Sequence, residues 1–265
     1  MKHYALVIEY QGSNYCGWQK QTHSLGIQAV LEKALSAVAD ESVTLICAGR
    51  TDAGVHATSQ VASFKTKAVR DNKAWLKGTN ASLPEDIKIR AVYSVFDDFN
   101  ARFSALYRRY QYLIYQDQSN TALWHQHSLW IDRKLDIEKM NHACRYLLGE
   151  QDFSAFRSSQ CQSHSSKRNI HHACFKTYGR WLVFDIQGNA FLHHMVRNIT
   201  GSMLKVGLGE QEPIWMQDLL KAKDRTIAGK TAPAKALYLV EVGYPEKTKV
   251  VAKNPLETLL SATAL

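Results

Sequence analysis

An aspartate between two glycines is the strongest candidate for chemistry in this sequence. Asp52 lies in the segment LICAGRTDAGVH, residues 45–56, between β-type runs at Val43–Cys47 and Gln60–Phe64. The glycines permit backbone angles that are closed to other residues and let another backbone come close. A loop held at both ends by strands can keep a carboxylate at a fixed place, where it could act as a nucleophile or a base.

Arg50 lies two positions before Asp52. On extended backbone this spacing puts both side chains on one face, so that they can pair. The plainer interpretation is a hairpin turn with a surface ion pair, which contributes almost nothing to stability. The turn alone favours the plainer interpretation, because isolated turn motifs have a high false-positive risk.

Composition limits the classes of protein to which this chain can belong. The 265 residues, 45% of them hydrophobic, suit one large domain or two of ordinary size with a substantial core. The net charge of +9 favours a polyanionic partner, although basicity for solubility alone is the alternative. No apolar run of about 18 residues and no signal peptide are apparent, so we expect no membrane span.

The five cysteines are scattered and contain no C-x-x-C motif, which fits free thiols in a reducing compartment. We therefore expect a cytoplasmic protein. Cys161 is followed by three histidines, but their spacing matches no usual zinc pattern, so no metal site is predicted.

Periodicity places the candidates on regular elements. We expect strands at His3–Tyr10, Val43–Cys47, Gln60–Phe64, Ile87–Val95, Tyr107–Tyr115, Ile170–Thr177, Trp181–Gln187 and Ala236–Val242. We expect helices at Ser24–Asp40, capped by Ser24 with Glu32 and Lys33 outside, and at Asp71–Ser82, Leu135–Leu148, Asn189–Val206 and Pro213–Ala222.

Three residues outside the loop have both a structural and a functional interpretation. Tyr110, with Tyr112 and Ile114 on one strand face, is either a core aromatic or a base platform. Arg102 either pairs with nearby aspartates or contacts phosphate. Arg197 falls on a helical stripe with His193 and Gly201, at the border of the buried face, where an arginine needs a carboxylate partner.

The motifs together resemble one family. Residues 49–57, GRTDAGVHA, look like the signature of the TruA family of tRNA pseudouridine synthases. Further similar segments are the Gly-Trp-Gln at 17–19, the Asn-Ala-Arg-Phe-Ser at 100–104, the Arg-Arg-Tyr-x-Tyr at 108–112, the Phe-x-His-His-Met-Val-Arg-Asn at 191–198 and the Leu-Tyr-Leu at 237–239. Ala236 stands where many relatives have glycine.

The resemblance implies roles for single residues. Asp52 would be catalytic, as nucleophile or base, with Arg197 paired to it and Arg50 in support. Tyr110 would stack on the uracil, and Leu237 would form a wall of its pocket. Arg197 would be the closer of the two arginines, because it comes from a packed helix.

The resemblance also implies an α+β fold of two RRM-like halves that share one mixed, mostly antiparallel sheet, with helices on one side and a central RNA-binding cleft. We expect an N-terminal half at 1–105, a C-terminal half at 106–246 and a peripheral tail at 247–265. The implied activity converts uridine to pseudouridine at positions 38, 39 and 40 of tRNA, in a homodimer, with no cofactor or metal. The rival hypotheses are a non-catalytic RNA-binding protein, a nucleoside hydrolase, which would need paired acids, and a purely structural protein.

Overall fold

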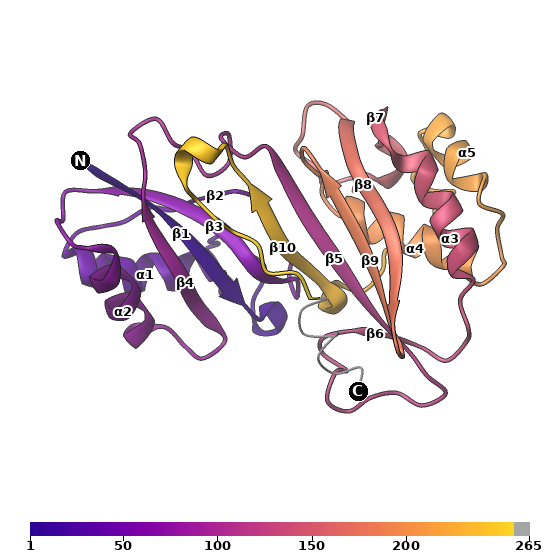
Figure 1. Cartoon of the computed structure of the whole chain (residues 1–265), viewed down its shortest axis with the longest axis horizontal. Coiled ribbons are helices and arrows are strands. Elements are labelled where there is room, and N and C mark those ends of the chain that lie inside the picture. Colours follow the sequence, from indigo (N-terminus) through magenta and orange to yellow (C-terminus); the bar gives the residue numbers. More distant parts are fainter. Residues whose placement is uncertain (257–265) are drawn as a thin grey trace. The chain divides into compact units, whose positions relative to one another are not determined.

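The computed structural model describes residues 1–256, which form two compact units (Figure 1). Unit 1 comprises Met1–Arg108 and Tyr238–Pro255. Unit 2 comprises Arg109–Leu237, together with Leu256. In each unit, helices pack on strands that pair both parallel and antiparallel. The predicted α+β class with a mixed sheet is therefore confirmed.

Unit 1 is built on the strand order β4-β1-β3-β10, with a short β2 paired to β3. Strands β1, β2 and β4 pair antiparallel with their neighbours, whereas β10 runs parallel to β3. The strands are β1 (Lys2–Tyr10), β2 (Ile46–Cys47), β3 (His56–Thr66), β4 (Ile87–Ser94) and β10 (Leu237–Gly243), whose first residue belongs to unit 2.

Two helices, α1 (Ile27–Ala39) and α2 (Asn72–Ser82), pack side by side in unit 1 (Figure 1). The fully buried Trp75 of α2 contacts the rings of Tyr4 and Phe64, which are cross-strand partners on β1 and β3. This aromatic cluster covers one face of the sheet. Asp71 caps α2 by accepting a hydrogen bond from the Ala74 amide.

The first helix differs from its prediction at two residues. It begins after Gly26, and Ser24 does not cap it but donates from its hydroxyl to Gln21. Glu32, expected on the outer face, is only 7% exposed. Its carboxylate accepts from the Leu45 amide at 3.0 Å, so the apparent outer face of the helix contacts the chain that leads into β2.

Unit 2 has the strand order β5-β9-β8-β7, with β6 parallel to β5. Strands β8 and β9 form the predicted hairpin, closed by Tyr178 opposite Trp181, and β7 adds antiparallel to β8. The strands are β5 (Tyr107–Gln116), which begins in unit 1, β6 (Leu129–Ile131), β7 (Gly149–Asp152), β8 (Lys167–Tyr178) and β9 (Trp181–Gly188).

The helices of unit 2 are α3 (Ile137–Cys144), α4 (Met195–Gly207) and α5 (Trp215–Ala222). Asn141 of α3 bonds through its side-chain amide to both the N–H and the carbonyl of Phe175, which fixes this helix against β8. Phe175 stacks on Phe184 of β9, with ring centroids 4.6 Å apart. The unit therefore has its own packed core.

Helix α4 starts six residues later than its periodicity predicts. His194 adopts φ 62°, in the left-handed region, and the helix begins at Met195. His193 is therefore not on a helical stripe with Arg197. The rings of His193 and His194 lie close together, with centroids 4.0 Å apart.

Gly201 has a close backbone neighbour. A Cβ atom there would lie 1.7 Å from the Lys230 carbonyl oxygen, so only glycine fits. The segment around Lys230 thereby lies directly against α4.

Residues 247–256 are not peripheral, in contrast to the predicted tail. The Val242 amide donates to the Ala252 carbonyl, the Asn254 amide to the Val240 carbonyl, and Thr58 Oγ1 to the Asn254 carbonyl. This stretch thus packs along β10, while residues 257–265 lie outside the described residues. Within residues 1–256, no helix is long and apolar enough to cross a membrane.

Candidate active site

The loop between β2 and β3 in unit 1 carries Asp52. It makes a tight turn in which the Val55 amide donates to the Asp52 carbonyl at 3.1 Å. Gly54 takes φ +78°, as the sequence predicts, whereas Gly49 does not use a positive φ. Asp52 is half-buried and Arg50 is exposed.

Side chains from two strands fix the loop backbone. The buried amide of Gln60, on β3, donates to the Gly49 carbonyl at 2.6 Å. The hydroxyl of Tyr10, on β1, shares a hydrogen bond of 2.8 Å with the hydroxyl of Thr51. These contacts fall on both sides of Arg50 and immediately before Asp52, so a rigid sheet positions the carboxylate.

A second backbone segment supports the loop from the N-terminal side. The Trp18 amide donates to the Thr51 carbonyl at 3.0 Å. Gly17, before it, adopts φ +82°, and a Cβ there would lie 2.6 Å from the same carbonyl oxygen. The Gly-Trp pair of the sequence is therefore a backbone support for Asp52, and Trp18 is fully buried as packing.

This close approach gives a testable prediction. Changing Gly17 to alanine should destabilise the fold by about 2 kcal/mol or more, because it combines left-handed strain of about 1 kcal/mol with a clash against the loop. We also expect a lower kcat, since the clash falls one residue from Asp52. Urea unfolding and initial rates measure the two effects.

The matched control is Gly149, which has φ +84° but no atom within 4 Å of its Cβ position. Gly149→Ala should cause only the conformational strain and leave kcat unchanged. Equal loss of activity in both variants would contradict a supporting role for Gly17.

Arg108 is a buried arginine that binds the same loop from a third side. Its Nε and a terminal nitrogen donate to the Ala48 carbonyl at 3.2 and 2.8 Å. The guanidinium also donates to the carbonyls of Ala105 and Arg102, at 3.3 and 2.5 Å. One fixed cation thus joins the Asp52 loop to the segment that carries Arg102.

The base of the loop is strongly cationic. Arg50, Arg102 and Arg108 all lie close enough to Cys47 to act on its thiol electrostatically. Burial nevertheless raises the pKa of Cys47 to about 12. The thiol stays protonated at neutral pH, so it does not neutralise the three guanidinium groups.

Glu32 and Gln28 on α1 form a further support that the sequence analysis missed. The Gln28 amide donates to the Glu32 carboxylate at 2.9 Å and to the Leu45 carbonyl at 3.2 Å, and Glu32 accepts from the Leu45 amide. The two side chains satisfy the backbone just before β2. Their i, i+4 spacing was the available signal, but it is equally typical of a solvated pair.

In unit 2, Tyr110 lies on β5 with 7% of its surface exposed. Its ring meets that of Phe191 edge to face, with centroids 5.2 Å apart. Tyr112, two residues on, is fully buried and donates its hydroxyl to the Pro233 carbonyl at 2.9 Å. The predicted tyrosine face of this strand is therefore formed.

Arg197, on α4, is half-buried in the same unit. Its Nε donates to the Ala232 carbonyl at 2.8 Å, and the Ala232 amide donates back to the Arg197 carbonyl. Burial raises the pKa of the Tyr112 phenol above its usual value, and the positive charge of Arg197 opposes that shift. Leu237, 5% exposed, follows the short 3-10 turn Ala234–Ala236, so Arg197 and Tyr112 bind the segment that leads into it.

The predicted site residues are thus divided between the units. Arg50, Asp52 and Arg102 belong to unit 1, where Arg108 links the segments that carry them. Tyr110, Arg197 and Leu237 belong to unit 2, where Arg197 binds Ala232 in the segment that leads into Leu237.

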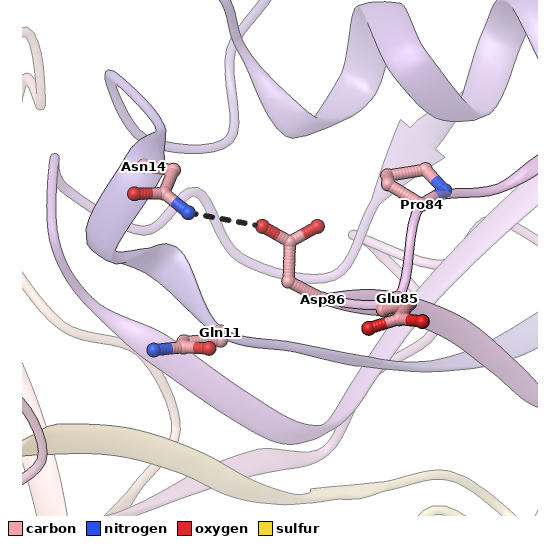
Figure 2. A pocket seen from close by; sticks show the side chains of 5 residues that line it. All are labelled: Gln11, Asn14, Pro84, Glu85 and Asp86. Carbon is pink, nitrogen blue, oxygen red and sulfur yellow. Dashed lines mark hydrogen bonds between the residues drawn. The ribbon is translucent and has the colours of Figure 1, made fainter.

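A surface hollow of about 380 Å³ lies elsewhere in unit 1, between the turn after β1 and the loop before β4 (Figure 2). Figure 2 shows the Asn14 amide directed at the Asp86 carboxylate, which it meets at 3.3 Å. Burial and Asp86 raise the pKa of the Tyr15 phenol, which donates to that carboxylate. With two acidic residues in its lining, the hollow is unsuited to a phosphate, and it contains no predicted site residue. Its lining residues are Gln11, Asn14, Pro84, Glu85 and Asp86.

Known proteins resemble the chain over almost its whole length. A sequence profile described as tRNA pseudouridine synthase matches residues 6–104 and 143–245. The tRNA pseudouridine synthase A of Francisella tularensis subsp. holarctica (strain FTNF002-00 / FTA) is 57% identical over 246 residues, covering 93% of this chain and 95% of the relative. That of Francisella philomiragia subsp. philomiragia is 55% identical over the same length.

Solved structures add a weaker likeness. A crystal structure of a Cbf5-Nop10-Gar1 complex matches with a TM-score of 0.37 and 10% identity, covering 89% of this chain and 57% of that one. This similarity is too low to define the fold by itself. The sequence matches are decisive: the chain belongs to the TruA family of tRNA pseudouridine synthases.

Proposed function

We propose that this protein converts uridine to pseudouridine at positions 38, 39 and 40 in the anticodon stem and loop of tRNAs, with Asp52 as the catalytic group. The observation that supports this most is the loop Ala48–Val55. Arg108 binds Ala48, Gln60 binds Gly49, and Tyr10 and the Trp18 amide both bind Thr51, so three positions just before Asp52 are fixed. Such rigidity is expected where one carboxylate must meet one sugar carbon.

The reaction breaks the glycosidic C–N bond, turns the uracil and joins its C5 to the sugar. Asp52 can assist either by attack at C1′ or by taking a proton from the sugar. Both routes need an ionised carboxylate. Arg197 is the proposed ion-pair partner and Arg50 the supporting cation.

Tyr110 would stack on the uracil, and Leu237 would close the pocket wall so that water does not reach the detached base. Within unit 2, Tyr110 packs against Phe191, and the segment that leads into Leu237 is bound by Tyr112 and Arg197. Because the isomerisation conserves every atom and is redox-neutral, it needs no external oxidant, reductant or group donor, and the proposal includes neither a cofactor nor a metal.

The proposed partner is tRNA, bound by a homodimer in the cytoplasm. The net charge of +9 and the three guanidinium groups near Cys47 suit the phosphate backbone. The target base must leave its stack to reach a loop aspartate, and unstacking costs least in and beside a hairpin loop. Arg102, which is exposed, is a proposed phosphate contact.

The test is tritium release from anticodon-arm transcripts labelled with 5-³H-uridine at one position each. We expect release at 38, 39 and 40, and none from a transcript labelled at a loop position outside these three. Products separated by chromatography must contain pseudouridine. Free uracil in their place would indicate a nucleoside hydrolase, and binding without any release would indicate a non-catalytic RNA-binding protein.

A further inference from the structure

Phe103 is held on the surface of unit 1 beside a cation. It is 79% exposed, although it is a large apolar residue. The guanidinium carbon of its neighbour Arg102 lies 5.4 Å from the centre of its ring. Arg102 lies over this ring rather than against Asp97 or Asp98 in the described part of the chain, which leaves its charge available to a partner.

The turn that presents Phe103 is rigid. The Asn100 side-chain carbonyl accepts from the amides of Arg102 and Phe103, at 2.9 and 3.1 Å. The Asn100 main chain exchanges hydrogen bonds with Ser104, whose amide and hydroxyl both take part. These bonds close the turn around one asparagine, so Phe103 cannot be withdrawn into the core without breaking it.

Two buried anchors hold the turn to the sheet. Ala101, fully buried, donates from its amide to the Ser63 hydroxyl at 3.2 Å and accepts from the Tyr244 hydroxyl at 2.6 Å. A single nitrogen of Arg108 then binds the carbonyls of both Arg102 and Ala48. The exposed ring is therefore at a fixed distance from the first residue of the Asp52 loop.

A single exposed phenylalanine is common on protein surfaces and has no meaning by itself. Here the exposed ring is combined with a rigid turn, an adjacent guanidinium and a direct link to the candidate catalytic loop. The partner that fits an open π-face beside a cation is a nucleobase with its phosphate. The cationic surroundings, with Arg50 and Arg108 also near Cys47, favour RNA over an apolar protein segment.

We propose that Phe103 is a stacking platform for an unpaired base of the RNA substrate, with Arg102 on the adjacent phosphate. The inference rests on the proposed function, because it assumes that RNA enters at the Asp52 loop. It adds a binding residue at a fixed place beside that loop.

The experiment measures binding of an unlabelled anticodon-arm transcript to the full chain at several salt concentrations. Phe103→Ala should weaken binding by about 5-fold to 100-fold, the effect of losing one stacked base, with the same dependence of log Kd on log salt. Phe103→Trp should restore the affinity. Arg102→Ala should instead reduce the salt slope by about one phosphate contact.

Phe96→Ala is the matched control, because Phe96 is also exposed, at 57%, on the same connection. It should leave affinity unchanged. Unchanged affinity in Phe103→Ala, or the same loss in Phe96→Ala, would overturn the platform. A shift of Phe103→Ala from dimer to monomer on size exclusion would also overturn it and assign the ring to a protein interface.

The binding assay separates this inference from the proposed function. If wild-type protein binds the transcript but releases no tritium, the catalytic proposal fails, and the Phe103 platform is still supported or overturned by its own affinity. If release depends on Asp52 but Phe103→Ala binds as wild type does, only the platform fails.

Discussion

Replacing Asp52 by asparagine is expected to lower kcat for tritium release by about four orders of magnitude or more, as for other groups that act directly on the reacting atoms. The amide keeps the shape of the side chain but has no negative charge. It can neither attack C1′ nor accept a sugar proton. Because removing a negative charge does not weaken phosphate binding, the Kd for the transcript should be unchanged or lower.

The control is the same substitution at Asp40, an exposed residue that ends α1 in the left-handed conformation. Asparagine accepts that conformation, so Asp40→Asn should keep both stability and kcat. Circular dichroism must show that Asp52→Asn is folded. Activity within tenfold of wild type in a folded Asp52→Asn protein would exclude Asp52 as the catalytic group and favour a different carboxylate.

The supports of this loop could be predicted only in part. The sequence indicated the flanking strands and the turn at Gly54, since these depend on local propensity and on glycine chemistry. Gln60, Tyr10 and Arg108 could not be assigned, because each bonds to a main-chain carbonyl or hydroxyl that is distant in sequence. Hydrogen bonds of that kind leave no periodic pattern.

The role of Glu32 could not be predicted from the sequence either. Its position opposite the apolar stripe of α1 is typical of a solvated face. Hydrophobic periodicity does not predict that a carboxylate will accept a hydrogen bond from the backbone amide of another segment. The predicted start of helix α4 was wrong for a different reason. Its apolar pattern continues upstream, but His194 enters the left-handed region, which a non-glycine residue adopts rarely and which no sequence signal marked here.

Unit 2 contains a buried ion pair that flanks the candidate uracil platform. Asp185 on β9, with no exposed surface, accepts from Arg109 Nε at 2.7 Å, from a second Arg109 nitrogen, and from the Gln111 amide at 3.0 Å. Arg109 and Gln111 lie on either side of Tyr110 on β5. The network therefore ties the tyrosine strand to its neighbour from the opposite face.

Changing Asp185 to leucine is expected to destabilise the protein by about 3–5 kcal/mol, because it leaves the Arg109 charge largely buried without its carboxylate. Arg109→Met should cost a similar amount by leaving Asp185 uncompensated. Urea denaturation measures both as shifts of the midpoint at constant slope. The matched control is the exposed pair of Lys139 and Glu212 in the same unit, where Glu212→Gln should cost less than about 1 kcal/mol.

The double variant Arg109→Met with Asp185→Leu decides what the pair contributes. Two charges taken out of water together gain little over apolar side chains of similar volume, so the double variant should recover most of the stability that either single variant loses. Losses that simply add would show that the two residues act independently. If stability returns but the KM for the transcript rises, the buried pair serves to hold Tyr110 in register and not to stabilise the fold, since an apolar pair would keep the packing and lose the directional bonds to β5.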